Sequence, residues 1–94
     1  MLRFGWDERK NKANRKKHGI WFEEARTVFD DPRALLFSDP DHSEEEERFI
    51  LLGASSAGRT LVVVHCHKES EELFRIISAR KASKKEVKAY EEGI

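Results

Sequence analysis

The chain has 94 residues, of which 38% are hydrophobic and 38% are charged, and its formal net charge is zero. This length predicts one domain, residues 1–94, because the chain is too short to build a second hydrophobic core. No window approaches the ~18 uninterrupted apolar residues of a membrane span, and the N-terminus lacks the apolar stretch of a secretory signal. The single cysteine, Cys66, excludes an intramolecular disulfide. We therefore expect a cytoplasmic protein without membrane contact.

The zero net charge hides three blocks of different sign. Residues 1–22 carry seven Lys/Arg against two acids, residues 23–47 carry two against ten, and residues 48–94 carry nine against six. If folding brings the two basic blocks together, they form a surface that attracts polyanions. The charge pattern therefore keeps nucleic acid open as a partner.

The first third of the chain predicts a short strand followed by two helices. Residues 2–6 alternate apolar with small or polar side chains, as a strand does. Asp7 is a suitable N-cap for a helix over residues 10–18. A second helix begins at residues 21–22, carries an apolar stripe at helical spacing and ends before Pro32.

The rest of the chain predicts four strands and a last helix. The strands are expected over residues 34–37, 48–54, 61–66 and 73–80, with an acidic turn region over residues 38–47. Ser83 and Glu86 form a capping box at the start of the last helix. The resulting order, β-α-α-β-β-β-β-α, predicts an α+β domain with a mostly antiparallel sheet and helices packed against it.

The stretch from Arg75 to Tyr90 gives the strongest indication of function. A β-branched strand contains Arg75 and ends at Arg80, and a basic helix with the only tyrosine follows. The guanidinium group offers a bidentate fork that matches a phosphate. This pattern favours a phosphodiester ligand, although the same arginines could instead pair with the acidic segment or cap a sheet edge.

Cleavage of RNA by its own 2′-hydroxyl requires in-line positioning, charge stabilisation at the phosphate and proton transfer, and it needs no metal. The candidates are Arg80, Arg75, Arg48 and Lys68 for charge, His65 and His67 for proton transfer, and Tyr90 for base stacking or acid catalysis. Further RNA contacts are expected from Lys10, Lys81 and Lys84. The general base is not assignable from these residues.

Strand alternation divides the candidates between two sheet faces. A regular hairpin places His65, His67, Ser78 and Arg80 on one face and Cys66, Lys68 and Arg75 on the other. A bulge would break this division. The sequence alone does not choose the functional face.

Two further patterns, a histidine pair and a polar helix face, have more than one interpretation. His65-x-His67 suggests a metal pair with His42, Cys66 or the glutamates of residues 44–47, but no second Cys/His pair stands at ligand spacing. We therefore expect neither a metal nor a cofactor.

Lys10, Asn14 and His18 follow i, i+4, i+8 spacing along one helix face. They form either a phosphate track, that is, a row of phosphate-binding side chains, or, as we favour, a polar seam, in which they pack against the sheet and satisfy backbone groups.

Several motifs of this sequence, taken together, resemble the BrnT toxin family. They are Trp6-Asp7-Glu8-x-Lys10-x3-Asn14-x2-Lys17-His18-Gly19-Ile20-x-Phe22-x2-Ala25, Asp41-His-Ser, Glu47-Arg48, Gly53, Val62-Val-Val-His65-Cys66, Arg75-Ile-Ile-Ser-Ala-Arg80 and Glu86-x3-Tyr90. The similarity extends over nearly the whole chain. Where close relatives have Tyr and Arg after His-Cys, this chain has His67 and Lys68, so the charge is kept but the guanidinium fork is lost.

The resemblance implies a fold like that of the RelE/ParE-type toxins of bacterial type II toxin–antitoxin modules. It implies ribonuclease activity that arrests translation, with Arg80 and Lys68 as the first choices for phosphate charge. It also implies a BrnA-like antitoxin with a ribbon-helix-helix part, a hetero-oligomer with this antitoxin, and contact with operator DNA only through the antitoxin. The alternative is a catalytically degenerate module that acts in antitoxin binding and operon regulation.

Overall fold

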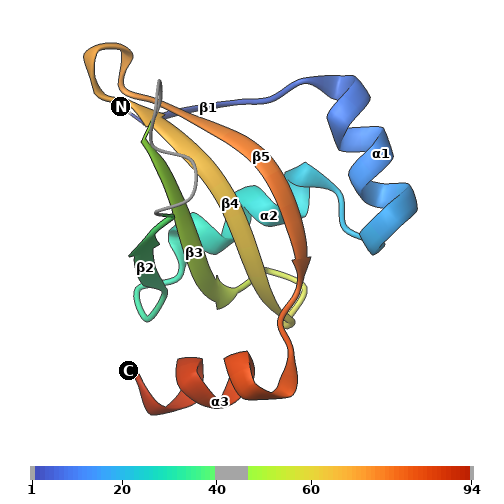
Figure 1. The fold of residues 1–94 in the computed structure, drawn as a ribbon, viewed down its shortest axis with the longest axis vertical. Helices are drawn as coiled ribbons and strands as arrows, with labels where there is room; N and C mark the ends of the chain where they lie inside the picture. Colours follow the sequence, from blue (N-terminus) through green and yellow to red (C-terminus); the bar gives the residue numbers. More distant parts are fainter. Residues whose placement is uncertain (1, 40–46, 94) are drawn as a thin grey trace.

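The computed structural model describes residues 2–39 and 47–93 (Figure 1). Its elements are β1 (Arg3–Gly5), α1 (Glu8–His18), α2 (Phe22–Thr27), η1 (Val28–Asp30), β2 (Leu35–Ser38), β3 (Arg48–Ala54), β4 (Thr60–Lys68), η3 (Glu69–Glu71), β5 (Leu73–Lys81) and α3 (Lys84–Glu92). The predicted α+β class and the order of helices and strands are confirmed. Most of the predicted acidic turn, residues 40–46, lies outside the described residues.

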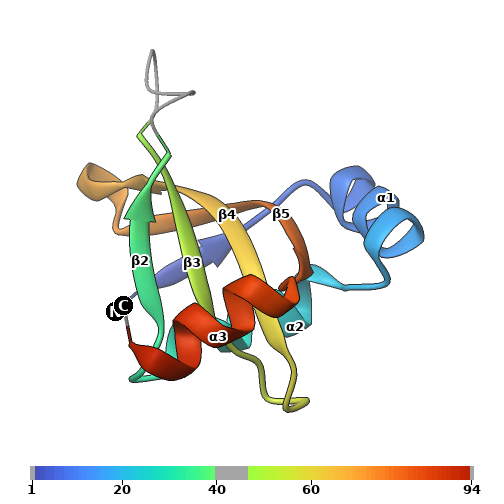
Figure 2. The same ribbon diagram turned by 60° about the horizontal axis from the view of Figure 1, so that its bottom comes forward.

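One five-stranded sheet, in the order β1-β5-β4-β3-β2, organises the molecule. β2 to β5 form antiparallel neighbours, whereas β1 pairs in parallel with β5, so the sheet is mostly antiparallel as predicted. α2 covers one face, and α3 crosses the opposite face at one end (Figure 2). We call these faces the α2 face and the α3 face. No helix within the described ranges combines the length and the apolar character that a membrane crossing requires.

The hydrophobic core lies between α2 and the sheet. Phe22 and Val28 from the helical side meet Leu61, Val63 and Ile76 from the strands, and all five side chains are almost completely buried. Helical spacing on one side and strand alternation on the other bring these apolar residues together. Burying each such side chain contributes about 1.5–3 kcal/mol relative to leaving it in water.

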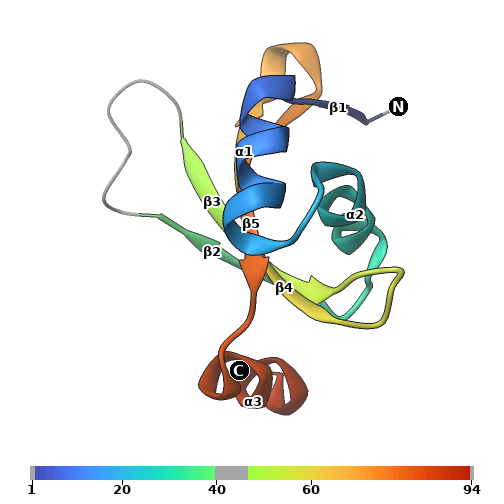
Figure 3. The same cartoon turned by 90° about the vertical axis from the view of Figure 1, so that its right-hand side faces the viewer.

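Buried asparagines attach α1 to the edge of the sheet, beside β5 (Figure 3). The Nδ2 of Asn14 donates to the carbonyl oxygens of Ile20 and Ala79, both at 2.9 Å, and its Oδ1 accepts from the N–H of Ala79 at 3.1 Å. Asn11 accepts from the N–H of Phe22 at 2.7 Å. Because β1 pairs only with Leu73–Arg75 of β5, Asn14 supplies hydrogen bonds that a neighbouring strand would otherwise make. The polar-seam interpretation is confirmed at Asn14.

α3 begins with the predicted capping box and is attached through its last turn. The Ser83 Oγ accepts from the N–H of Glu86, and the Glu86 carboxylate accepts from the N–H of Ser83. At the other end, the Tyr90 hydroxyl donates to Oδ2 of Asp31 at 2.6 Å. The same carboxylate oxygen accepts from the N–H of Ala54 at 2.8 Å, so Asp31 connects α3 to β3.

A β-bulge interrupts the pairing of β4 with β5. Val64 pairs with Ser78, but His65 pairs with Ile76, so Ile77 is an extra residue in β5. An extra residue reverses the alternation of side chains beyond it.

This bulge makes the predicted division of side chains wrong. Arg75 pairs with Cys66 and Arg80 pairs with Val62, and Cys66 and Val62 lie four residues apart on β4. Arg75 and Arg80 therefore share the α3 face. His65 shares the α2 face with the core residue Val63, on the side opposite to Arg80.

Candidate nucleic-acid interface

Cationic side chains from four strands lie together on the α3 face. Arg48 of β3 pairs with Cys66 of β4, which pairs with Arg75 of β5. Lys68 lies two residues further along β4, and the register of β1 places Arg3 in the same row across β5. Directly paired residues, and residues two apart on a strand, share a face. We call Arg3, Arg48, Lys68 and Arg75 the cationic group.

Arg3 is the member of this group that the sequence analysis missed. Its Nη2 donates to the carbonyl oxygen of Glu71, in the β4–β5 turn, at 2.9 Å. The alternation of residues 2–6 indicated which side chains share a face, and Phe4 does stack on Phe74, with ring centroids 5.6 Å apart. Only the parallel pairing of β1 with β5, which joins distant parts of the sequence, shows which residues neighbour Arg3.

Arg80 lies on the same face but apart from the cationic group. Its partner Val62 is four residues from Cys66 on β4, which corresponds to roughly 13 Å along a strand. The Arg80 guanidinium is engaged: Nη1 donates to Oε1 of Glu86 at 2.8 Å, and Nη2 donates to Oε2 at 2.9 Å. These hydrogen bonds lower the pKa of Glu86 to about 2 and raise the pKa of Arg80. The carboxylate occupies the fork through which Arg80 would bind a phosphate.

The two histidines of β4 lie away from the cationic group. His65 is 1% exposed, and the rings of Phe29, Phe49 and Phe74 surround it at centroid distances of 4.8 to 5.9 Å. Burial lowers the pKa of His65 to about 4, so the ring is neutral at neutral pH. His67 stacks on Phe74, with centroids 4.3 Å apart. The expectation that His65 and His67 share a face with Arg80 is therefore wrong.

Tyr90 holds α3 in place through its hydroxyl. The hydrogen bond to Asp31, with burial, raises the pKa of Tyr90, so the phenol stays protonated. The pKa of Asp31 is lowered: burial opposes the ionised form, but hydrogen bonds from the Ala54 N–H, the Tyr90 hydroxyl and the Arg33 N–H outweigh it. The Tyr90 ring also lies 5.7 Å from the guanidinium carbon of Arg33. These contacts make Tyr90 a docking residue of α3.

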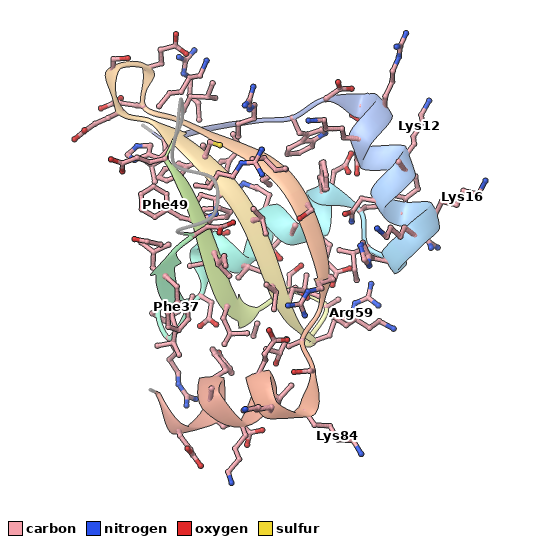
Figure 4. The ribbon with its side chains drawn as sticks, in the orientation of Figure 1. Lys12, Lys16, Phe37, Phe49, Arg59 and Lys84 are labelled. Atoms are coloured by element: carbon pink, nitrogen blue, oxygen red, sulfur yellow. The ribbon has the colours of Figure 1, made fainter. Side chains whose placement is uncertain are left out.

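The remaining predicted RNA contacts lie in three separate places. Lys81 pairs with the core residue Leu61 and so sits on the α2 face, where the Arg59 hydrogen bonds chiefly, and the charge of Lys81 to a smaller extent, lower the pKa of Glu24. Lys84, in the first turn of α3, points away from the sheet (Figure 4). Lys10 lines a groove of about 230 Å³ between α1 and β5.

The described residues do not complete the metal site considered around His65 and His67. Among them, no three His, Cys, Asp or Glu side chains lie close enough together to hold a metal ion. His42 and residues 44–46, which were possible further ligands, lie outside the described ranges.

Comparison with known proteins identifies the family. Residues 6–86 match the family model described as "Ribonuclease toxin, BrnT, of type II toxin-antitoxin system". The chain belongs to the BrnT family. Membership confirms the resemblance drawn from the spaced motifs, and it implies an antitoxin partner.

A solved structure shows the same fold as this BrnT-family chain. It is the crystal structure of the Brucella abortus ribonuclease toxin BrnT, which is 24% identical in sequence and superposes with a TM-score of 0.67. The match covers 89% of this chain and 100% of the Brucella chain. The comparison with curated protein sequences finds no significant match.

Proposed function

We propose that this BrnT-family protein cleaves RNA by in-line attack of the 2′-hydroxyl on the adjacent phosphate, without a metal ion, and so inhibits translation. The observation that carries the proposal is the cationic group: the register of four strands gathers Arg3, Arg48, Lys68 and Arg75 on one face of a rigid sheet. The family description supports RNA as the substrate class.

In this proposal, Arg48 and Arg75 bind the scissile phosphate from two sides. They lie on strands separated by β4, so their backbones are roughly 10 Å apart, and two long side chains can approach one phosphate between them. Fixed positive charge stabilises the negative charge that develops on the phosphate oxygens in the transition state. Lys68 adds a point charge without the planar fork of arginine.

Arg80 joins the site in this proposal when a phosphate displaces the Glu86 carboxylate from its guanidinium. The fork is already held in the bidentate geometry that a phosphate needs. Neither His65 nor His67 transfers protons in this scheme, because both lie on the α2 face. Tyr90 is a positioning residue for α3, on the evidence of its hydrogen bond to Asp31.

The proposal includes the partner that neutralises the toxin. A BrnA-like antitoxin with a ribbon-helix-helix part would cover the cationic group with an acidic or amphipathic segment, and so compete with RNA for the same cations. The two proteins would form a hetero-oligomer that reaches operator DNA only through the antitoxin. Because the substrate is translated message, we place this activity in the cytoplasm.

The proposal is tested by in-vitro translation with primer-extension mapping of the message. We expect cleavage by the wild type and by the control Lys85→Gln/Lys88→Gln, whose lysines are exposed on α3. Arg48→Gln/Arg75→Gln should lose about 100-fold or more in cleavage rate, because transition-state charge is removed, and Arg80→Ala should also be impaired. A folded Arg48→Gln/Arg75→Gln variant that cleaves like the wild type would rule out the cationic group as the site.

One observation favours a second function. The Arg80 fork is occupied by Glu86, and both β4 histidines lie on the other face. A catalytically degenerate module that acts in antitoxin binding and operon regulation would show this arrangement. In the same assay it would leave the message intact, while a separate binding measurement would show that it still binds the antitoxin.

A further inference from the structure

The groove between α1 and β5 lies beside the cationic group and is itself lined by cations. Its lining residues are Lys10, Ala13, Asn14, Lys17 and His18 from α1 and Ile77 and Ser78 from β5. Ser78 pairs with Val64, so its side chain lies on the α3 face, as that of Arg75 does. The groove is therefore reached directly from the face that carries the cationic group.

α1 supplies an unusual density of positive charge to this groove. The helix contains six Lys/Arg and one acid, Glu8, and all six cationic residues are exposed. Lys10 and Lys17 are seven residues apart, so they lie on the same side of the helix and roughly 10 Å apart along its axis. Two cations at this separation suit a chain of repeated negative charges better than they suit a single small anion.

Much of the groove surface is carbon, but only two of its lining residues, Ala13 and Ile77, have apolar side chains. The amide of Asn14 is fully engaged with the backbone of Ile20 and Ala79, so it forms a wall and is not available to a ligand. Anchoring side chains of peptides favour closed, well-packed apolar pockets, whereas charged and polar residues make up most of the lining of this groove. The remaining groups, Lys10, Lys17, His18 and Ser78, are donors suited to phosphate and ribose oxygens.

We propose that the α1–β5 groove is a second phosphate-binding subsite, which holds the backbone of single-stranded RNA next to the cleaved bond. This inference rests on the proposed function, since it names the site that would bind the nucleotides beside the scissile phosphate of the same RNA. Lys10 and Lys17 bind successive stretches of the phosphate backbone, while Ser78 and His18 lie within hydrogen-bonding reach of a strand in the groove. An efficient substrate is therefore longer than the dinucleotide that spans the scissile phosphate.

The experiment measures RNA binding apart from cleavage. The probe is a fluorescent single-stranded RNA with every 2′-hydroxyl methylated, which cannot attack its own phosphates, and binding is followed by anisotropy between 50 and 200 mM salt. The groove variant is Lys10→Gln/Lys17→Gln. The matched control, Lys12→Gln/Lys16→Gln, removes the same charge from the same helix, but Lys12 and Lys16 project away from the sheet (Figure 4). Glutamine keeps a helix propensity close to that of lysine.

We expect the groove variant to bind roughly tenfold more weakly at low salt and to lower the slope of log affinity against log salt by about 1.4, because two phosphate contacts are lost. The control should keep the wild-type slope. Equal losses in the two variants, or no loss in either, would overturn the subsite. So would a groove variant that keeps its RNA affinity but loses binding to poly-L-glutamate, which would indicate an acidic protein ligand instead.

Cleavage of unmethylated RNA of the same sequence separates this inference from the proposed function. If the wild type cleaves and the two double variants behave alike in binding, the subsite fails while the nuclease assignment stands. If the wild type binds through the groove but leaves RNA intact, the nuclease assignment fails while the subsite stands.

Discussion

The carboxylate of Glu86 determines whether the Arg80 guanidinium is available to a phosphate. Glu86 accepts two hydrogen bonds from the Arg80 guanidinium, and one of its oxygens also accepts from the N–H of Ser83 at the start of α3. The pair is partly exposed, with 45% of the Arg80 side chain and 32% of the Glu86 side chain accessible. At this exposure its contribution to stability is small, on the order of 1 kcal/mol or less. Its larger effect is to set which anion Arg80 binds.

The variant Glu86→Gln should strengthen RNA binding and cleavage several-fold. Glutamine serves as well as glutamate in a capping box, but it lacks the charge that holds Arg80, so a phosphate has less to displace. Thermal unfolding of the variant should stay close to that of the wild type. A folded Glu86→Gln protein that cleaves more slowly than the wild type would indicate instead that Glu86 positions Arg80 for catalysis.

His65 should make stability depend on pH. Its pKa is lowered from 6.5 to about 4 in the folded protein, so between these values the unfolded chain binds a proton that the folded protein does not. The free energy of unfolding should therefore fall as pH drops through this window, by a total on the order of 3 kcal/mol at its lower end.

Urea unfolding at pH 7, 6, 5 and 4 tests this expectation for the wild type and for His65→Leu. Leucine suits the surrounding rings of Phe29, Phe49 and Phe74, and it has no proton to bind. The variant should lose less stability than the wild type between pH 6.5 and 4. Parallel curves for the two proteins would show that His65 does not carry the effect.

At the scale of elements, α1 is attached by hydrogen bonds where most helices use apolar packing. Its exposed surface is cationic, so a wide apolar stripe would have competed with the charge that the groove requires. Asn14 and Asn11 replace that stripe with specific bonds to the backbone of β5 and α2. A helix held in this way keeps a fixed register against β5, which fixes Lys10 and Lys17 relative to Ser78.

Replacing Asn14 with alanine should lower the free energy of unfolding by about 3 kcal/mol, because backbone groups of Ala79 and Ile20 lose buried partners. Chemical denaturation gives the value directly. Lys12→Ala, on the exposed side of the same helix, serves as the control and should change stability by less than about 0.5 kcal/mol. If the two variants were equally stable, the bonds of Asn14 would not be what holds α1.

At the scale of the whole molecule, zero net charge coexists with a strongly cationic side. The cationic group and the exposed lysines of α1 belong to the two basic blocks of the sequence, residues 1–22 and 48–94. Pairing of β1 with β5, together with the attachment of α1 to β5, brings these blocks side by side. Association with a polyanion depends on this local arrangement, because exposed charges beyond about 10 Å are largely screened.

RNA affinity should therefore depend steeply on salt despite the zero net charge. Four phosphates neutralised by the cationic group contribute about −2.8 to the slope of log affinity against log salt, and two more in the α1–β5 groove contribute about −1.4. The wild-type slope should therefore be about −4.2, which is a loss of roughly 300-fold between 50 and 200 mM. Anisotropy with the methylated RNA measures this slope. Arg48→Gln/Arg75→Gln should flatten it by about 1.4, and a nearly flat slope in the wild type would exclude binding through these cations.

The elements of this fold and three members of the cationic group, Arg48, Lys68 and Arg75, were predictable from the sequence. The place of Arg3 and the engagement of Arg80 were not. Capping residues such as Asp7 and Ser83, and the alternation along the strands, indicate local structure because they act over a few neighbouring residues. Arg3 lies near Arg75 because residues 3–5 pair in parallel with residues 73–75, which are distant in the sequence, and no local pattern reveals this pairing. The engagement of Arg80 by Glu86 likewise depends on how α3 returns over the sheet.

The extra residue at Ile77 has a consequence for reading related sequences. Removing one position from β5 would shorten the strand by only one residue. The side chains on one side of the deletion, either those around Arg75 or those around Arg80, would then point to the opposite face of the sheet. A gap at this point in an alignment of relatives therefore marks a change in which side chains meet the ligand, even when both arginines are still present in the text of the sequence.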